Sequence, residues 1–266
     1  MEYLPVYIGI GCIVGMLTGL LGVGGGTVIV PALTLCFTAL KFPAQFAIHS
    51  AIGTSLACIV FGSVSGLRAH HSHGAVDWSI VKRLAPGIVI GTLLGSKIVV
   101  LIPARPLKLF FLCFLFYAAT QSLLNFKPPP SRQLPETAGM WIAGMVIGLI
   151  SAFVGIGGGA VSIPFMTWCN VKLHHAIGTS AALGFPIAVA GAIGFIANGL
   201  RETALPAYSW GYVYLPALIG IAGMSIFMAP LGAKLAHRLP VPTLKRTFAV
   251  FLYVIGIKMA YDMFAH

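Results

Sequence analysis

The chain has 266 residues, of which 58% are hydrophobic and only 8% are charged, and its mean hydropathy is +0.97. Soluble domains carry about 25% charged residues, so this composition excludes a soluble globular protein and indicates an all-α polytopic membrane protein. The formal net charge is +11 at pH 7. The basic residues are scattered along the chain, which predicts contacts with the head groups of the lipid bilayer and excludes nucleic acid as a partner.

The acidic residues are few, and all of them fall in the termini or near the ends of predicted spans. They are Glu2, Asp77, Glu136, Glu202 and Asp262. Because cation pumps usually place carboxylates inside the helix bundle, this distribution argues against a cation and favours a small anionic substrate. The five cysteines show no CxxC spacing and are typical of small core residues. We therefore expect neither a metal site nor a cofactor.

A glycine cluster interrupts the first apolar stretch, which covers residues 5–38 and is longer than one membrane span of about 20 residues. The stretch has no basic region before it, so we expect a retained span and not a cleaved signal. Gly11, Gly15 and Gly19 recur every fourth residue and predict a helix-packing face. The cluster Gly24–Gly26 has no such period, and each glycine costs about 1 kcal/mol inside a helix. The sequence therefore predicts a break there.

Three further apolar spans follow, at residues 46–67, 78–101 and 107–124. The first of them begins with the motif Ala51–Ser55, Ala-Ile-Gly-Thr-Ser. A proline-rich polar segment, residues 127–137, cannot be helical and is typical of an extended linker. We predict that it separates an N-terminal transmembrane repeat, residues 1–126, from a C-terminal one, residues 138–266.

The second repeat contains the same landmarks in the same order. The glycine motif of residues 22–31 returns at 155–164, and Ala51–Ser55 returns as Ala176–Ser180. Apolar spans match as well, at 138–168, 176–198, 210–233 and 244–264. An internal duplication follows, with about eight transmembrane segments in two homologous four-segment halves. Each half opens with a glycine-broken helix or a hairpin. An even number of spans per half gives parallel repeats and an odd number inverted ones, and the sequence leaves both open.

The two glycine breaks predict a binding site between the halves. Backbone N–H groups at a helix break, with the positive end of the following half-helix, bind anions, and transporters bind substrate at such breaks near the bilayer midplane. The predicted substrate-binding residues are the break glycines and the hydroxyl residues that recur beside them. They are Gly24, Gly25, Gly26, Thr27, Thr54, Ser55, Gly157, Gly158, Gly159, Ser162, Thr179 and Ser180. The alternative is that the glycines serve close helix packing and the hydroxyls bond their own helices.

Histidines stand at the entry of each Ala-Ile-Gly-Thr-Ser motif. His49, His174 and His175 are candidates for a proton-coupling role, or else ordinary interfacial residues. Three more histidines, His70, His71 and His73, share one loop that supplies no fourth metal ligand, so an exposed loop is expected. No serine stands in a nucleophile-elbow pattern and no acid is placed to orient a histidine. The sequence thus argues against an enzyme.

The duplicated GxGGGxxxxP motif, each copy followed by AIGTS, resembles the TauE/SafE sulfite exporter family, also called the TSUP anion permeases. The resemblance covers the whole chain. It implies a multi-pass transporter of the bacterial inner (plasma) membrane that exports small sulfur-containing anions such as sulfite, sulfoacetate or other organosulfonates. Alternatives are an uptake permease for another small anion or carboxylate, a histidine-dependent metal-ion transporter, and a channel-like or structural membrane protein. The sequence does not separate a monomer from a homodimer.

Overall fold

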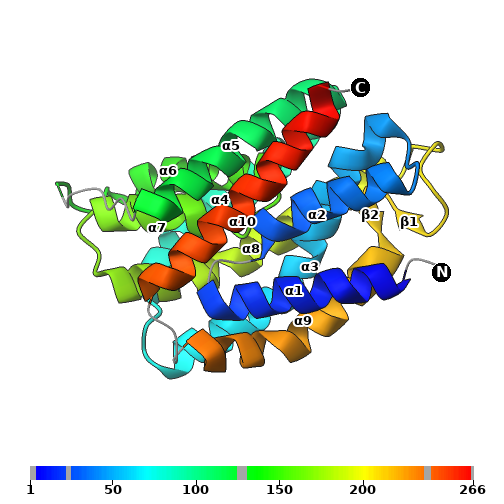
Figure 1. Cartoon of the computed structure of the whole chain (residues 1–266). Coiled ribbons are helices and arrows are strands. Elements are labelled where there is room, and N and C mark those ends of the chain that lie inside the picture. The colour runs from blue at the N-terminus through cyan, green and yellow to red at the C-terminus, as the bar shows by residue number, and fades with distance from the viewer. Residues whose placement is uncertain (1–3, 22–24, 125–130, 237–240, 265–266) are drawn as a thin grey trace.

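The computed structural model describes residues 4–21, 25–124, 131–236 and 241–264. Ten helices and two short strands make up the described part of the chain (Figure 1). In chain order they are α1 (Leu4–Leu21), α2 (Gly26–Ala39), α3 (Ala44–Ser72), α4 (Trp78–Leu101), α5 (Ala104–Leu124), α6 (Thr137–Val154), α7 (Gly159–Trp168), α8 (Leu173–Gly199), β1 (Ser209–Trp210), β2 (Val213–Tyr214), α9 (Leu215–Ala236) and α10 (Val241–Phe264). Six of the described helices are long and apolar enough to cross a membrane. The polytopic all-α class is confirmed.

The second glycine segment forms the tip of a helical hairpin made by α6 and α7. The N–H of Ser131, just before α6, donates to the carbonyl of Trp168 at the end of α7, over 3.2 Å. The far ends of both helices therefore lie together, and the tip points into the protein. Gly155 (φ +71°) and Gly158 (φ +79°) adopt left-handed conformations at the tip. Glycine is the residue that tolerates such backbone angles without strain, which explains why the tip is built from it.

The first glycine segment has the same arrangement, with α1 and α2 as the two legs. Tyr7 near the start of α1 and Phe37 near the end of α2 both pack against Tyr214, with ring centroids 6.0 and 5.6 Å apart. Gly22 to Gly24 lie outside the described residues, so the tip is described from Gly25 onward. Because each glycine segment separates two helices, the described part of the chain has ten helices where the hydropathy pattern suggested eight segments.

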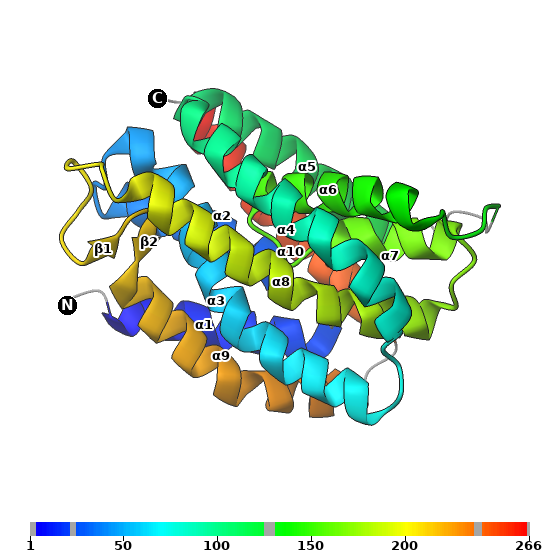
Figure 2. The same ribbon diagram turned by 180° about the vertical axis from the view of Figure 1, so that it is seen from behind.

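The helix ends gather at two faces of the molecule (Figures 1 and 2). The β face, at the right of Figure 1, carries β1 and β2, the α4–α5 turn, and the start of α3. The opposite face carries the α3–α4 connection, the end of α7 and the start of α8. The α1–α2 hairpin enters from the β face and the α6–α7 hairpin from the opposite face. The two tips therefore approach each other in the interior.

Helices from the two halves of the chain pack in pairs, α1 with α9 and α4 with α6. A Cβ on Gly15 would lie 2.7 Å from Cα of Ser225 in α9, and one on Gly95 would lie 2.8 Å from Cβ of Ala152 in α6. Such distances leave room only for hydrogen, so the glycine stripes of α1 and α4 let the paired helices touch. The predicted packing role of Gly11 and Gly15 is confirmed. Both pairs join residues on opposite sides of the 127–137 linker.

Candidate functional site between two hairpin tips

The two glycine tips touch in the middle of the protein. A side chain on Gly26, the first residue of α2, would collide with the carbonyl of Gly155 and would come within 2.8 Å of Cα of Ile156. The hydroxyl of Ser55 in α3 donates to the carbonyl of Gly155 over 2.8 Å. Segments a hundred or more residues apart in the sequence are thus joined at one point.

Two helices begin at this point with their N-termini directed inward. The N–H groups of Val28 and Ile29 bond back to Gly25, and those of Val161 and Ser162 bond back to Gly158. The earlier N–H groups of each helix have no intrahelical acceptor, as at every helix start. Among the described residues, no acceptor is found for the N–H of Gly157 or Gly159. Each N-terminus also carries about half a positive elementary charge from the helix dipole, so their convergence favours an anion.

Buried hydroxyl groups lie beside both tips. The hydroxyls of Ser162 and Ser180 are 2.7 Å apart, and one donates to the other. The hydroxyl hydrogen of the accepting serine then has no acceptor among the described residues. The Ser180 hydroxyl would lie 3.6 Å from a Cβ on Gly159. Thr27 is only 2% exposed, and its hydroxyl has no partner among the described residues. An unsatisfied buried hydroxyl costs about 1–3 kcal/mol, which a polar ligand or water at the tip would remove.

Not every tip glycine is explained by packing. Gly26, Gly155 and Gly158 are required by close contacts or by a positive φ. A Cβ on Gly159, however, would meet nothing closer than 3.6 Å, and the nearest atom to a Cβ on Gly157 is a methyl group of Ile59 at 3.3 Å. Gly159 is also the first residue of α7 and its φ is not positive. Contact with neighbouring helices therefore does not require a glycine at position 159, and the space beside it leaves the backbone open to close approach.

The repeated threonines hold the junction between the halves. The N–H of Tyr214, just before α9, donates to the hydroxyl of Thr54 over 3.0 Å, and the N–H of Asp77, just before α4, donates to that of Thr179 over 2.9 Å. The adjoining glycines serve the same contact. A Cβ on Gly53 would lie 2.6 Å from the carbonyl oxygen of Tyr212, and one on Gly178 2.5 Å from that of Ala75. The Gly-Thr dipeptide of each motif thus contacts the backbone just before a helix that belongs to the other half.

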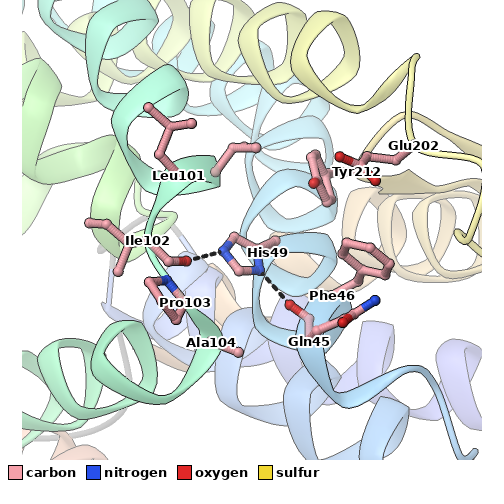
Figure 3. Close-up of a pocket in the computed structure, with 10 residues that line it drawn as sticks. Gln45, Phe46, His49, Leu101, Ile102, Pro103, Ala104, Glu202 and Tyr212 are labelled. Carbon is pink, nitrogen blue, oxygen red and sulfur yellow. Dashed lines mark hydrogen bonds between the residues drawn. The ribbon is translucent and has the colours of Figure 1, made fainter.

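An open cavity of about 360 Å³ lies at the β face, around His49. Figure 3 shows His49 between α3 and the α4–α5 turn, with Tyr212 and Glu202 across the cavity. His49 is 4% exposed, and its two ring nitrogens lie 3.0 Å from the carbonyl oxygens of Gln45 and Ile102. The sequence pattern singled out His49 but not the loop that supplies Tyr212 and Glu202, because no periodic pattern marks that loop as part of a site.

The other histidines lie at the opposite face. His174 is exposed and stacks on His175 with ring centroids 4.0 Å apart, while Nδ1 of His175 lies 3.4 Å from the carbonyl of Ala75. His71 accepts a hydrogen bond from the Trp78 indole over 3.3 Å. No group of three or more potential metal ligands is found among the described residues.

The buried polar side chains of the described residues are hydroxyl groups and His49. Asp77 and Asp262 are half-buried, and Glu136 and Glu202 are exposed. The interior around the tips thus offers hydrogen-bond donors and positive dipole ends without a carboxylate to repel an anion or to ligate a cation.

Comparison with known proteins identifies the relatives of this chain. Residues 7–259 match the family model described as sulfite exporter TauE/SafE. A probable membrane transporter protein of Haemophilus influenzae is 36% identical over 252 residues, which cover 94% of this chain and 95% of that protein. The probable membrane transporter protein YdhB of Bacillus subtilis is 29% identical, over 90% of this chain and 92% of its own length. A third relative, from Methanocaldococcus jannaschii, is 27% identical over 96% of this chain and 95% of its own. No solved structure matches.

Proposed function

We propose that this chain, which belongs to the sulfite exporter TauE/SafE family of membrane transporters, exports small sulfur-containing anions such as sulfite, sulfoacetate or other sulfonates. The family and its relatives are multi-pass membrane transporters and not enzymes, and this chain shares that character, with the inner membrane as its location. What we propose beyond the family is the chemical class of the anion and the direction in which it is moved.

The convergence of two helix N-termini at the glycine tips carries this proposal. A sulfonate or sulfite group presents several oxygen acceptors on one small centre, and it needs several donors from different directions. The N–H groups of Gly157 and Gly159, which have no acceptor among the described residues, and the hydroxyls of Thr27, Ser162 and Ser180 would supply them. By the repeat of the glycine motif, the N–H groups of Gly24, Gly25 and Gly26 are proposed to act in the same way. Thr54, Ser55 and Thr179 would act beside them by holding the tips and the helix starts in place.

Alternating access would proceed by relative movement around this site. We infer two inverted repeats, α1–α5 and α6–α10, each consisting of one hairpin and three helices that run between the faces. An odd number of crossings per repeat inverts the second copy, and entry of the two hairpins from opposite faces supports that inference. The anion would be reached from one face at a time while both tips remain in contact with it.

Flux measurements in proteoliposomes test the function. We expect labelled sulfite or sulfoacetate to exchange across liposomes that contain the protein, and unlabelled members of the same class to compete. A thermal-shift panel of sulfite, sulfate, thiosulfate, sulfoacetate and taurine identifies which anion stabilises the protein. If the protein exchanges a carboxylate and none of the sulfur-containing anions, the substrate class is carboxylates and the proposed class is wrong. Stabilisation by divalent cations alone would favour a histidine-dependent metal transporter and refute the anion site.

A further inference from the structure

His49 lies where α3 meets the C-terminal end of α4, two helices that also share α8 as a packing partner. It belongs to α3, and its Nε2 lies 3.0 Å from the carbonyl oxygen of Ile102. Ile102 is the C-cap residue of α4. Helix α3 holds the start of α9 through Thr54, and α9 packs on α1. Helix α4 packs on α6. The bond from His49 to Ile102 therefore fastens the α1–α3–α9 group to the α4–α6 group at the β face (Figure 3).

The hydrogen-bond pattern defines the charge state of the ring in this conformation. Both partners of His49 are backbone carbonyl oxygens, which only accept hydrogen bonds. A neutral imidazole has one N–H and one lone pair, so one of its nitrogens would face a carbonyl oxygen without a hydrogen between them. The imidazolium form has N–H groups at both nitrogens and satisfies both carbonyls. The protonated ring is therefore the form that satisfies both contacts of this conformation.

The surroundings allow the proton to be lost again. Burial opposes the charged ring, whereas two carbonyl acceptors favour it, so loss of the proton removes the cost of burying a charge. Among the described residues that line the cavity, the titratable groups facing His49 are Tyr212 from the loop before β2 and Glu202 from the loop after α8. The lining from the α4–α5 turn is apolar. Burial, together with the nearby Glu202 carboxylate, raises the pKa of Tyr212 to about 12, which keeps Tyr212 a neutral phenol.

We propose that His49 binds the proton that is coupled to anion movement. Water in the open cavity supplies the proton to the ring lone pair and takes it back on release, and no other bond is formed or broken. In the protonated state the ring holds Ile102 and keeps the α4–α5 turn fastened to α3. When Nε2 loses its proton and Nδ1 keeps the bond to Gln45, the carbonyl of Ile102 loses its donor and the fastening at the β face is released. This inference rests on the proposed transport function and assigns the coupling to one residue.

The test separates anion exchange from proton-driven accumulation. Proteoliposomes with the membrane potential clamped are given labelled sulfoacetate, either at equal concentration on both sides or with a gradient of one pH unit. One proton per anion then sustains about a tenfold anion ratio, because a tenfold ratio corresponds to about 1.4 kcal/mol. In His49→Gln we expect exchange at equal pH to continue and the pH-driven ratio to fall to one. His174→Gln, at the same place in the second motif but exposed, should keep the tenfold ratio.

A spectroscopic measurement makes the outcome independent of the transported anion. In protein labelled with ¹⁵N-histidine, the signal that disappears in His49→Gln should show both ring nitrogens protonated at mildly acidic pH and one nitrogen protonated at higher pH. A neutral His49 throughout the range from about pH 5 to 8, where histidines ordinarily titrate, would overturn the inference. A His49→Gln variant that still accumulates anion tenfold would do the same. Absence of exchange in the wild type would instead refute the proposed function. The ¹⁵N signal of His49 would then still show whether the ring gains and loses a proton.

Discussion

At the scale of single residues, Gly159 is the position that best separates a binding role from a packing role. It is the first residue of α7, its neighbours leave room for a methyl group, and its φ is not positive. Alanine is a better helix former than glycine by about 1 kcal/mol. Gly159→Ala should therefore fold at least as well as the wild type. If the anion approaches the backbone at this residue, the added methyl group should reduce exchange by tenfold or more, since about 1.4 kcal/mol of lost binding corresponds to that factor.

The control for Gly159→Ala is Gly66→Ala, because nothing lies within 4 Å of a Cβ on Gly66 in the C-terminal part of α3. Thermal midpoints in detergent and anion exchange in liposomes are measured for both variants. Equal exchange in Gly159→Ala and Gly66→Ala would show that no ligand approaches α7 at this point. Gly158 is unsuitable for such a test, since its φ of +79° makes any side chain strained, and loss of transport would then report loss of folding.

The AIGTS motif shows that sequence can mark a residue as important without predicting its hydrogen-bond partner. Its duplication marked both threonines as important, and a hydroxyl beside a binding site is a reasonable expectation. The bond that each threonine makes goes to a backbone N–H more than a hundred residues away in the other half, Tyr214 for Thr54 and Asp77 for Thr179. Sequence pattern carries no information on such pairing because the partner atom is main chain and is present at every residue. The substrate-binding role of the two threonines stays a prediction.

At the scale of elements, the N-cap residue Asp77 makes the stability of α4 depend on pH. Its carboxylate accepts hydrogen bonds from the N–H groups of Ser79 and Ile80 and from the Ser79 hydroxyl. Partial burial by itself would raise the pKa of Asp77. The bonds from Ser79 and Ile80, and the nearby His175, outweigh that effect and hold the pKa below its ordinary value. The cap therefore stabilises α4 in its ionised form.

The pH dependence of stability follows from this direction. Because the pKa of Asp77 is lower in the folded than in the unfolded protein, its contribution is complete above the ordinary value near 3.9. It is lost as the pH falls through the lower folded value. Asp77→Ala should lower the free energy of unfolding by about 1 kcal/mol at neutral pH and should remove part of the acid sensitivity. Thermal midpoints from pH 3 to pH 7 measure both effects. An unchanged midpoint at pH 7 would show that the cap does not stabilise α4.

The hairpins mark the limit of prediction for whole elements. Hydropathy predicted the breaks at Gly24–Gly26 and Gly157–Gly159, and the four-residue glycine stripes predicted close helix contacts. The sequence did not show whether the chain crosses the membrane or turns back after each break. A short apolar helix such as α7, with 10 residues, has the same composition in both cases. The direction depends on what the helix end contacts. For α7 that contact is the bond from the Ser131 N–H to Trp168, which lies outside any local pattern.

At the scale of the whole molecule, the sequence halves are not the units that pack together. The duplication suggested two transmembrane repeats joined by residues 127–137, and this division stays a prediction. The tightest helix contacts, however, join α1 to α9 and α4 to α6 across that boundary. Glycine stripes identify a surface that needs a close partner but do not name the partner. Movement during transport is therefore better pictured between these exchanged groups than between residues 1–126 and 138–266.

The distribution of basic residues over the two faces predicts how the protein lies in the membrane. Among the described residues, the basic positions at or near the helix ends of the opposite face are Arg68, Lys82, Arg83, Arg132, Lys172, Lys234, Lys245 and Arg246. Those toward the β face are Lys41, Lys97, Arg105, Lys108, Arg201 and Lys258. Lysine and arginine are enriched on the cytoplasmic side of membrane proteins. The excess at the opposite face therefore places that face in the cytoplasm and the β face, with the cavity around His49, outside.

Cysteine labelling in intact bacterial cells tests this orientation. Lys172 and Arg201 are exposed residues at the opposite face and the β face, respectively. In a background without the native cysteines, Arg201→Cys should react with a membrane-impermeant maleimide in intact cells, and Lys172→Cys should react only after the cells are opened. The reverse pattern would place the β face in the cytoplasm. With the β face outside, the cavity that supplies protons to His49 opens to the side that respiring bacteria acidify, so the proton gradient acts directly on the residue proposed to sense it.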